Sequence, residues 1–368
     1  MSTPGVCGGL RSQAPGTGLK GLTGRAGLRG WVGLTGLLLA GCLLSPPARA
    51  QAPEPAPTGA GALTQAEARA WLTRIHAAAR ISNYQGTLVY SAGGLLSSSR
   101  VWHFFVADQT YERLEAHDGR QQRITRHNDT VHTFWPQSKT AVAERRETLA
   151  AWSTTPQAVD PQALEQYELR REGLARVAGR EATVLTLEPR DALRHAQRLW
   201  VDQSTGLMLR ADVIGGAASA RTVLESTAFS EIEIGIRPQP DTVLQMMRKL
   251  DGYQVLRPQQ KRTTLDNEGW TLARPVPGFR LAGCMRRGMD TTGDDQSVLQ
   301  AVFSDGLTHV SVFAEPFNAQ RHRADLQAQQ GATATLMMRR GEHWITTVGN
   351  VPLATLKQFA DALERRRP

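Results

Sequence analysis

The segment SRVWHFFV, residues 99–106, narrows the choice of fold because, as a strand, it has no polar face. Successive side chains of a strand point to opposite faces of the sheet. One face carries Val101, His103 and Phe105, and the other carries Trp102, Phe104 and Val106. Antiparallel sheets commonly keep one face in water, so this strand needs a cover on both sides. The cover is either a second protein layer or the apolar hollow of a curved sheet, which would suit acyl chains or an extended apolar peptide.

Short strands joined by turns are predicted from residue 83 to about residue 235, because apolar runs alternate there with turn residues. Asp118-Gly119 suits a tight hairpin turn, and Gly206 suits a left-handed position in another hairpin. Upstream, Thr64 and Glu67 predict the capping box of a helix. The apolar side chains of that helix recur at helical spacing and are Trp71, Leu72, Ile75, Ala78 and Ala79. We expect this helix to cover the neighbouring strands.

A second, smaller module is predicted after residues 236–264, which hold several prolines and one short helix at 241–250. One predicted hairpin joins strands 297–304 and 308–315, and another joins 334–340 and 343–349 around Gly341. Residues 352–366 predict a closing amphipathic helix. Strands followed by a terminal helix indicate the α+β class.

The first 50 residues have the pattern of an export signal: a basic, Gly-rich start, an apolar run at 31–44 and a small-x-small site at 48–50. The run is shorter than the roughly 20 apolar residues that span a membrane. LAGC at 39–42 resembles a lipobox, so lipoprotein processing at Cys42 is the alternative to cleavage after Ala50. Both routes place the mature chain outside the cytoplasm. Residues 51–62, rich in Pro, Ala and Gly, predict a flexible spacer.

The net charge of +9 does not indicate a nucleic-acid-binding protein. Five of the 43 Lys and Arg residues lie in the first 50 residues, which contain no acidic residue. The remaining chain has 38 basic and 34 acidic residues, a small excess.

A search for reactive motifs favours a protein that is not an enzyme and that has no cofactor. The sequence contains no H-E-x-x-H, G-x-S-x-G, P-loop or dinucleotide fingerprint. His103, His127 and His132 would form a metal site only if the fold brought them together, so we expect no metal. Cys284 is the single cysteine after cleavage at Ala50, and we interpret it as a buried, inert thiol.

Five motifs, in order along the chain, resemble the RseB/MucB family. They are NYQGTLVY at 83–90, WPQSKTAV at 135–142, LWVDQSTGLMLR at 199–210, FSDGLTHVSVF at 303–313 and TVGNVPLATLKQFADAL at 347–363. The segment SAGGLLSSS departs from the family, which usually carries more charge after its first strand. This departure leaves the ligand preference open.

The resemblance implies a large domain similar to the LolA-type lipoprotein carriers: an open, strongly curved antiparallel β half-barrel with helices. A smaller α+β domain of antiparallel strands with a C-terminal helix would follow it. The implied function is a periplasmic negative regulator of an envelope-stress sigma factor. Such a regulator binds the periplasmic segment of a membrane-spanning anti-sigma factor similar to RseA or MucA and protects it from site-1 proteolysis. Lipid or lipopolysaccharide acyl chains would release that hold.

Two sets of candidate residues follow. The predicted ligand-binding set is Leu88, Tyr90, Trp102, Phe104, Phe105 and Trp135. The predicted partner-binding set lies in the hairpin of the small domain and is Ser304, Asp305, Gly306, Leu307, Val310, Val312 and Phe313. All of these residues would equally suit an ordinary core.

The sequence leaves alternatives open. A lipoprotein or lipid carrier of the LolA type would use the same hollow without needing the second domain, whereas a hydrolase would need a polar site that the motifs do not supply. Formation of a homodimer or a higher oligomer is also open. The predicted division is a signal peptide at 1–50, a spacer at 51–62, the LolA-like domain at 63–235, a linker at 236–264 and the small C-terminal domain at 265–368.

Overall fold

The computed structural model describes residues 61–145, 163–216, 220–288, 297–322 and 324–366. The predicted signal peptide and residues 51–60 of the predicted spacer lie outside these ranges. The described range 163–216 begins with a single 3-10 turn, η1 (Ala163–Glu165). Within the described residues, no helix combines the length and the hydropathy that a membrane span requires.

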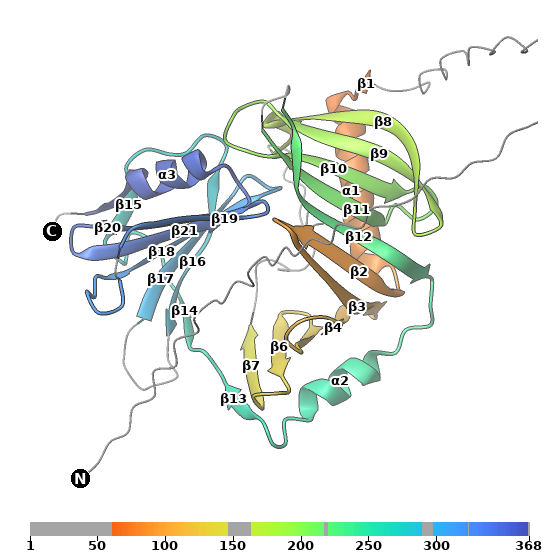
Figure 1. Ribbon diagram of the computed structural model, residues 1–368, viewed down its shortest axis with the longest axis horizontal. Helices are drawn as coiled ribbons and strands as arrows, with labels where there is room; N and C mark the ends of the chain where they lie inside the picture. Colours follow the sequence, from red (N-terminus) through yellow and green to blue (C-terminus); the bar gives the residue numbers. More distant parts are fainter. Residues whose placement is uncertain (1–60, 146–162, 217–219, 289–296, 323, 367–368) are drawn as a thin grey trace, which may run out of the picture. The chain divides into compact units, whose positions relative to one another are not determined.

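A 13-stranded sheet contains the predicted large-domain strands (Figure 1). In spatial order its strands are β1 (Gly61–Ala62), β8 (Tyr167–Val177), β9 (Arg180–Pro189), β10 (Ala196–Asp202), β11 (Met208–Gly215), β12 (Thr222–Ile234), β2 (Tyr84–Ala92), β3 (Leu95–Val106), β4 (Gln109–Ala116), β5 (Arg123–His127), β6 (Thr130–Trp135), β7 (Thr140–Arg145) and β13 (Gln254–Leu256). The order is linear from β1 to β13, so the described strands form an open sheet and not a closed barrel. Neighbours pair antiparallel except for β13, which runs parallel to β7. Gly61 and Ala62 belong to the predicted spacer, but they pair with β8.

A seven-stranded antiparallel sheet forms the second module. Its strands are β14 (Gln260–Arg262), β16 (Arg280–Gly288), β17 (Ser297–Ser304), β18 (His309–Pro316), β21 (His343–Gly349), β20 (Thr333–Arg340) and β19 (Leu326–Gln330), with β15 (Trp270–Leu272) and β22 (Leu363–Arg365) as a separate pair. The two hairpins predicted here, β17–β18 and β20–β21, are both confirmed. The sequence did not indicate the short strands β13 and β14 in the predicted linker.

Three α-helices accompany the sheets: α1 (Gln65–Ile81), α2 (Pro240–Arg248) and α3 (Leu353–Ala362). The capping box of α1 is confirmed, since the Glu67 amide donates to Thr64 Oγ1 and the Thr64 amide donates to a Glu67 carboxylate oxygen. Leu72 and Ile75 of α1 are fully buried against β8–β11. These antiparallel sheets with three helices confirm the predicted α+β content.

The closing helix is shorter than predicted. α3 ends at Ala362, and Leu363–Arg365 pairs with β15 instead of continuing the helix. The Ala273 amide donates to the Ala362 carbonyl, which satisfies a backbone acceptor that the end of the helix leaves open. The apolar stripe of the helix is nevertheless buried, with Leu356 and Phe359 at 0 % exposure.

Candidate functional site

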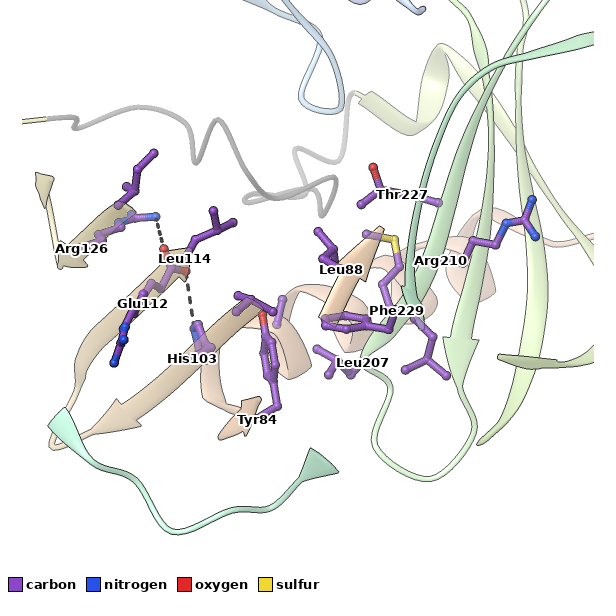
Figure 2. A pocket seen from close by; sticks show the side chains of 17 residues that line it. Tyr84, Leu88, His103, Glu112, Leu114, Arg126, Leu207, Arg210, Thr227 and Phe229 are labelled. Atoms are coloured by element: carbon purple, nitrogen blue, oxygen red, sulfur yellow. Dashed lines mark hydrogen bonds and ion pairs between the residues drawn. The ribbon is translucent and has the colours of Figure 1, made fainter. Parts of the chain in front are cut away.

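An apolar cavity of about 100 Å³ lies against the inner face of the 13-stranded sheet (Figure 2). Its lining comes from α1 and from the strands β11, β12, β2, β3, β4 and β5, which are consecutive in the sheet. The lining residues used below are Tyr84, Leu88, Val101, His103, Glu112, Arg126, Met208, Thr227 and Phe229. Because β11 and β5 are five strand spacings apart, they would be about 24 Å apart in a flat sheet. Their contribution to one cavity requires the sheet to curve around it.

The two apolar faces of β3 are covered in different ways. On one face, Phe104 is buried in a cluster with Tyr111 and Val243, and Trp102 and Val106 pack against the same cluster. Val243 belongs to α2, so the helix of the predicted linker supplies this cover. On the other face, Val101 and His103 line the cavity. The strand therefore has a protein layer on one side and the cavity on the other.

The cavity has one polar wall. His103 is 3 % exposed, and its Nδ1 lies 2.7 Å from the Ser82 carbonyl oxygen. Its Nε2 lies 3.8 Å from Glu112 Oε1, while Arg126 Nη1 is 3.5 Å from Glu112 Oε2. The Tyr84 ring stacks on the imidazole at 5.1 Å. An amphiphile in this cavity would meet apolar side chains together with the charged side chains of Glu112 and Arg126 and, further along the lining, of Arg113 and Arg210.

His103 should make the protein less stable in acid. Burial lowers the pKa of His103, and the nearby Glu112 only partly opposes this effect. The unfolded chain then binds a proton near its ordinary pKa of about 6.5, whereas the folded chain binds it only at lower pH. We expect the free energy of unfolding to fall as the pH decreases below about 6.5. His103→Asn, which keeps a donor for the Ser82 carbonyl, should flatten this decrease.

The measurement is urea unfolding at pH 7.5 and pH 5.5, with the exposed His117→Asn as the matched control. Burial also lowers the pKa of His76, His132, His195, His309 and His343, so the variant should remove only part of the pH dependence. If the free energy of unfolding of His103→Asn fell between pH 7.5 and pH 5.5 by as much as that of the wild type, the contribution of His103 to acid sensitivity would be contradicted.

The predicted ligand-binding residues do not all meet at this cavity. Leu88 lines it, together with Tyr84 from the same face of β2. Trp102 and Phe104 lie on the opposite face of β3, under α2. Phe105 lies below the Arg80 guanidinium at 5.5 Å, and Trp135 is half-buried at the end of β6. Burial and the Glu225 carboxylate raise the pKa of the half-buried Tyr90 to about 12, and this residue is also outside the lining.

Sequence reasoning missed the half of the cavity that β11 and β12 supply. Met208, Thr227 and Phe229 are wall residues, and they come from strands more than 100 residues downstream of β2. The alternation of Thr227 and Phe229 is visible in the sequence and predicts a shared face. The sequence does not indicate which strand lies next to β12. In the structure β12 pairs with β2, and this pairing aligns Phe229 with Leu88.

A second concavity of about 320 Å³ lies at the turn between β17 and β18, and we call it the turn groove. Its lining residues are Glu165, Gln166, Gly278, Arg280, Leu281, Ala282, Ser304, Asp305 and Gly306. Three residues of the predicted partner-binding set, Ser304, Asp305 and Gly306, are therefore together here. Leu307 instead packs against the core of the large sheet. Val310 and Val312 are in the core of the small module, whereas Phe313 is half-buried on the opposite face of β18.

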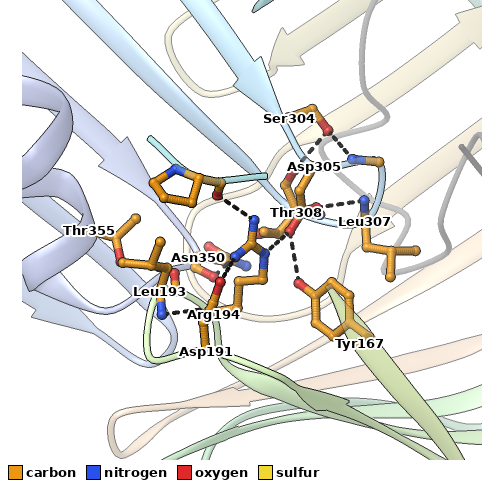
Figure 3. Close-up of polar contacts among 12 residues, drawn as sticks. Tyr167, Asp191, Leu193, Arg194, Ser304, Asp305, Leu307, Thr308, Asn350 and Thr355 are labelled. Carbon is orange, nitrogen blue, oxygen red and sulfur yellow. Dashed lines mark hydrogen bonds and ion pairs between the residues drawn. The ribbon is translucent and has the colours of Figure 1, made fainter. Parts of the chain in front are cut away.

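Buried charges connect the turn groove to the large sheet (Figure 3). Arg194, between β9 and β10, donates from Nε to Asp305 Oδ2 at 2.6 Å. The Tyr167 hydroxyl donates to the same oxygen at 3.0 Å, and burial raises the pKa of Tyr167 well above its ordinary value. A second inter-sheet ion pair joins Arg287 Nη2 of β16 to Glu144 Oε2 of β7 at 2.9 Å.

No metal site was found within the described residues, where no cluster of three or more His, Cys, Asp or Glu side chains could hold an ion. Cys284 is buried, as predicted, and burial raises the pKa of its thiol to about 11. A thiol with this pKa is protonated at neutral pH and is a poor nucleophile.

The described residues thus form an apolar cavity at the large sheet and a separate groove at the turn between β17 and β18. The chain belongs to the MucB/RseB family: residues 67–268 match the MucB/RseB N-terminal domain, and residues 264–364 match the C-terminal domain. The family resemblance carried by the five sequence motifs is thereby confirmed.

Relatives and solved structures agree with this assignment. The sigma factor AlgU regulatory protein MucB of Pseudomonas aeruginosa is 30% identical over 301 residues, which cover 80% of this chain and 90% of the relative. The sigma-E factor regulatory protein RseB of Haemophilus influenzae is 23% identical over 77% of this chain and 87% of its own length. The MucA/MucB complex structure from Pseudomonas aeruginosa contains a chain that matches with a TM-score of 0.62 and 28% identity, over 82% of this chain and 100% of that chain.

Proposed function

We propose that this protein is a periplasmic negative regulator of an envelope-stress sigma factor. It binds the periplasmic segment of a membrane-spanning anti-sigma factor, protects that segment from site-1 proteolysis, and releases it when lipid or lipopolysaccharide binds. The observation that carries the proposal is the match along most of the chain to MucB structures, including one of MucB in complex with MucA(peri) at a TM-score of 0.60. Membership in a family of regulatory proteins also favours a binding protein over an enzyme.

The turn groove is the proposed contact for the anti-sigma segment. Its volume of about 320 Å³ is within the range of ligand pockets, roughly 300–1,000 Å³. Leu281 is 45 % exposed at its edge, so a bound segment would cover an apolar side chain that water now contacts. A protease needs its substrate to be extended and accessible. A segment bound in the turn groove would be partly covered, so its cleavage would be slower.

The curved sheet is the proposed lipid site. The curvature that the cavity requires supports an open half-barrel similar to that of the LolA-type carriers. Leu88, Phe229 and Met208 would contact an acyl chain, while Glu112 and Arg126 would face its polar end. Tyr90, Phe105 and Trp135 would be secondary contacts for the acyl chain. Trp102 and Phe104 would contribute only through the packing of β3.

The size of the cavity supplies a mechanism for release. About 100 Å³ is less than the roughly 300 Å³ at which ligand pockets begin, so an acyl chain would have to separate the walls formed by β5 and β11. A ligand that binds only the widened state shifts the population toward that state. If the widened state holds the anti-sigma segment less tightly, lipid and segment weaken each other by the same factor.

The division of the chain is part of the proposal. The leader at 1–50 exports the chain to the periplasm, a spacer follows, and the lipid-binding domain predicted at 63–235 also includes Gly61 and Ala62, which pair with β8. Residues 236–264 link it to the small domain at 265–368. Processing at Cys42 stays the alternative to cleavage after Ala50.

Leu88→Trp tests the proposal, because a larger side chain would fill the cavity. We expect the variant to bind an anti-sigma periplasmic peptide within twofold of wild-type affinity and still slow its cleavage by the site-1 protease. The lipopolysaccharide concentration that releases the peptide should rise at least tenfold. Fluorescence anisotropy of the labelled peptide measures the peptide affinity and the lipopolysaccharide concentration that releases the peptide.

Leu96→Trp is the matched control, since Leu96 is on β3 but 71 % exposed. It should respond to lipopolysaccharide like the wild type. Normal release from Leu88→Trp would exclude this cavity as the lipid site, and a wild-type protein that binds no anti-sigma peptide would overturn the regulator itself.

A lipoprotein or lipid carrier is the second candidate, because the apolar cavity would also suit it. Co-purification from envelope extract distinguishes the two functions. A stoichiometric anti-sigma fragment supports the regulator, whereas bound lipoprotein without that fragment supports the carrier.

A further inference from the structure

Arg194 joins the two sheets at the turn groove through a contact that is fully removed from solvent. Its side chain and that of Asp305 are both 0 % exposed. Asp305 lies in the turn between β17 and β18, whereas Arg194 lies in the loop between β9 and β10 (Figure 3). The pair therefore ties a loop of the large sheet to a turn of the small one.

The guanidinium contacts both sides of the turn groove. Besides donating to Asp305, it donates from Nη2 to the Pro277 carbonyl at 2.9 Å. A Cβ atom built on Gly278 would lie 2.2 Å from Arg194 Nη2, and Gly278 has a φ of +74°. Arg194 thus packs directly under Gly278 on one wall while it binds Asp305 on the other. Asp191 pairs with its remaining nitrogen, Nη1.

Asp305 passes this constraint to the backbone of its turn. Its Oδ1 accepts hydrogen bonds from the Leu307 amide at 2.8 Å and from the Thr308 amide at 2.7 Å. The Ser304 hydroxyl donates to the Thr308 carbonyl at 2.8 Å. The position of the carboxylate therefore determines the conformation of Ser304–Thr308, which includes the wall residues Ser304 and Gly306.

Stability alone is a weak reason for such a pair. Removing two charges from water costs about as much as their attraction returns, and apolar replacements of similar volume are often neutral. A planar guanidinium, however, directs several donors at fixed angles, which a lysine cannot reproduce. These directions suit a residue whose role is to set geometry.

We propose that Arg194 is a positioning residue for the turn groove. It holds the Gly278 wall and the Ser304–Gly306 wall at a fixed separation, so peptide binding in the small module depends on an ion pair made by the large sheet. The inference rests on the proposed function, in which an anti-sigma segment binds in this groove.

The double variant Arg194→Met/Asp305→Asn tests the inference, because it removes both charges together and leaves neither one buried alone. We expect urea unfolding close to that of the wild type. Hydrogen exchange of the Leu307 and Thr308 amides should become at least tenfold faster, and the Kd for an anti-sigma periplasmic peptide should rise at least tenfold. The single variant Arg194→Lys should also show faster exchange of these two amides and a higher peptide Kd, since lysine keeps the positive charge but not the directions of the guanidinium donors.

Arg180→Met/Asp202→Asn is the matched control, because Arg180 pairs with the buried Asp202 within the large sheet. It should change neither the exchange of the turn amides nor the peptide Kd. Unchanged exchange and unchanged Kd in the double variant would overturn the inference. If the wild type binds no peptide, the proposed function fails, and the exchange rates then decide whether Arg194 positions the turn.

Discussion

Phe359→Ala is expected to lower the free energy of unfolding by about 4 kcal/mol. Phe359 is 0 % exposed on α3, and its ring lies 5.0 Å from that of Phe303 and 5.3 Å, edge to face, from that of Phe279. Alanine removes these contacts and leaves a cavity between α3, β17 and the start of β16. The surrounding core can close such a gap only in part.

Urea unfolding at neutral pH measures the effect as a lower transition midpoint with an unchanged slope. Lys357→Ala on the exposed face of the same helix is the control and should change the stability by less than about 0.5 kcal/mol. A cost below about 1 kcal/mol for Phe359→Ala would mean that α3 does not complete the core of the small module.

Asp202→Ala is expected to cost about 3 kcal/mol, because it removes a buried carboxylate from a saturated network. Asp202 is 2 % exposed at the end of β10. It accepts hydrogen bonds from Arg180 Nε at 2.7 Å, from the Ser204 hydroxyl at 2.7 Å and from the Thr205 amide at 2.8 Å. The carboxylate therefore shapes the turn that precedes β11, where Gly206 has a φ of +80°.

The same residue gives a pH dependence with a definite sign. Burial alone would raise the pKa of Asp202, but the hydrogen bonds from Arg180, Ser204 and Thr205 more than offset burial and hold it well below the ordinary value. Its stabilisation is present above the unfolded pKa of about 4 and is lost as the pH falls below that value.

Urea unfolding at pH 7 and pH 3 should therefore show a smaller acid loss in Asp202→Ala than in the wild type. Asp266→Ala is the control, because the Asp266 side chain is 64 % exposed in its ion pair with Arg366. This variant should change the free energy of unfolding little at either pH. An equal acid loss in Asp202→Ala and in the wild type would contradict the lowered pKa.

Local features of the fold were predictable from the sequence. The capping box at Thr64 and the hairpin at Ser304–Leu307 each depend on residues close together in the chain, and both formed as expected. The end of α3 was not predictable. Leu363 fits the apolar stripe of a helix equally well, and only the presence of β15 selects the strand.

The candidate site was predictable only in part, because its walls come from distant segments. Leu88 was identified from the alternation of β2, whereas the two apolar faces of β3 left both a protein layer and a cavity open as the second cover, and the structure has the cavity. The cover of the other face was missed, since α2 was assigned to a linker. Arg194 carried no signal, because a buried arginine and a solvated one look the same in a sequence.

The parallel pairing of β13 with β7 limits how the small module can move. β13 ends at Leu256 and β14 begins at Gln260, so the chain passes from one sheet to the other within four residues. A fully extended chain of that length spans about 14 Å. While both strands stay paired, this short tether keeps the edge strand β14 of the small sheet close to the edge strand β13 of the large sheet.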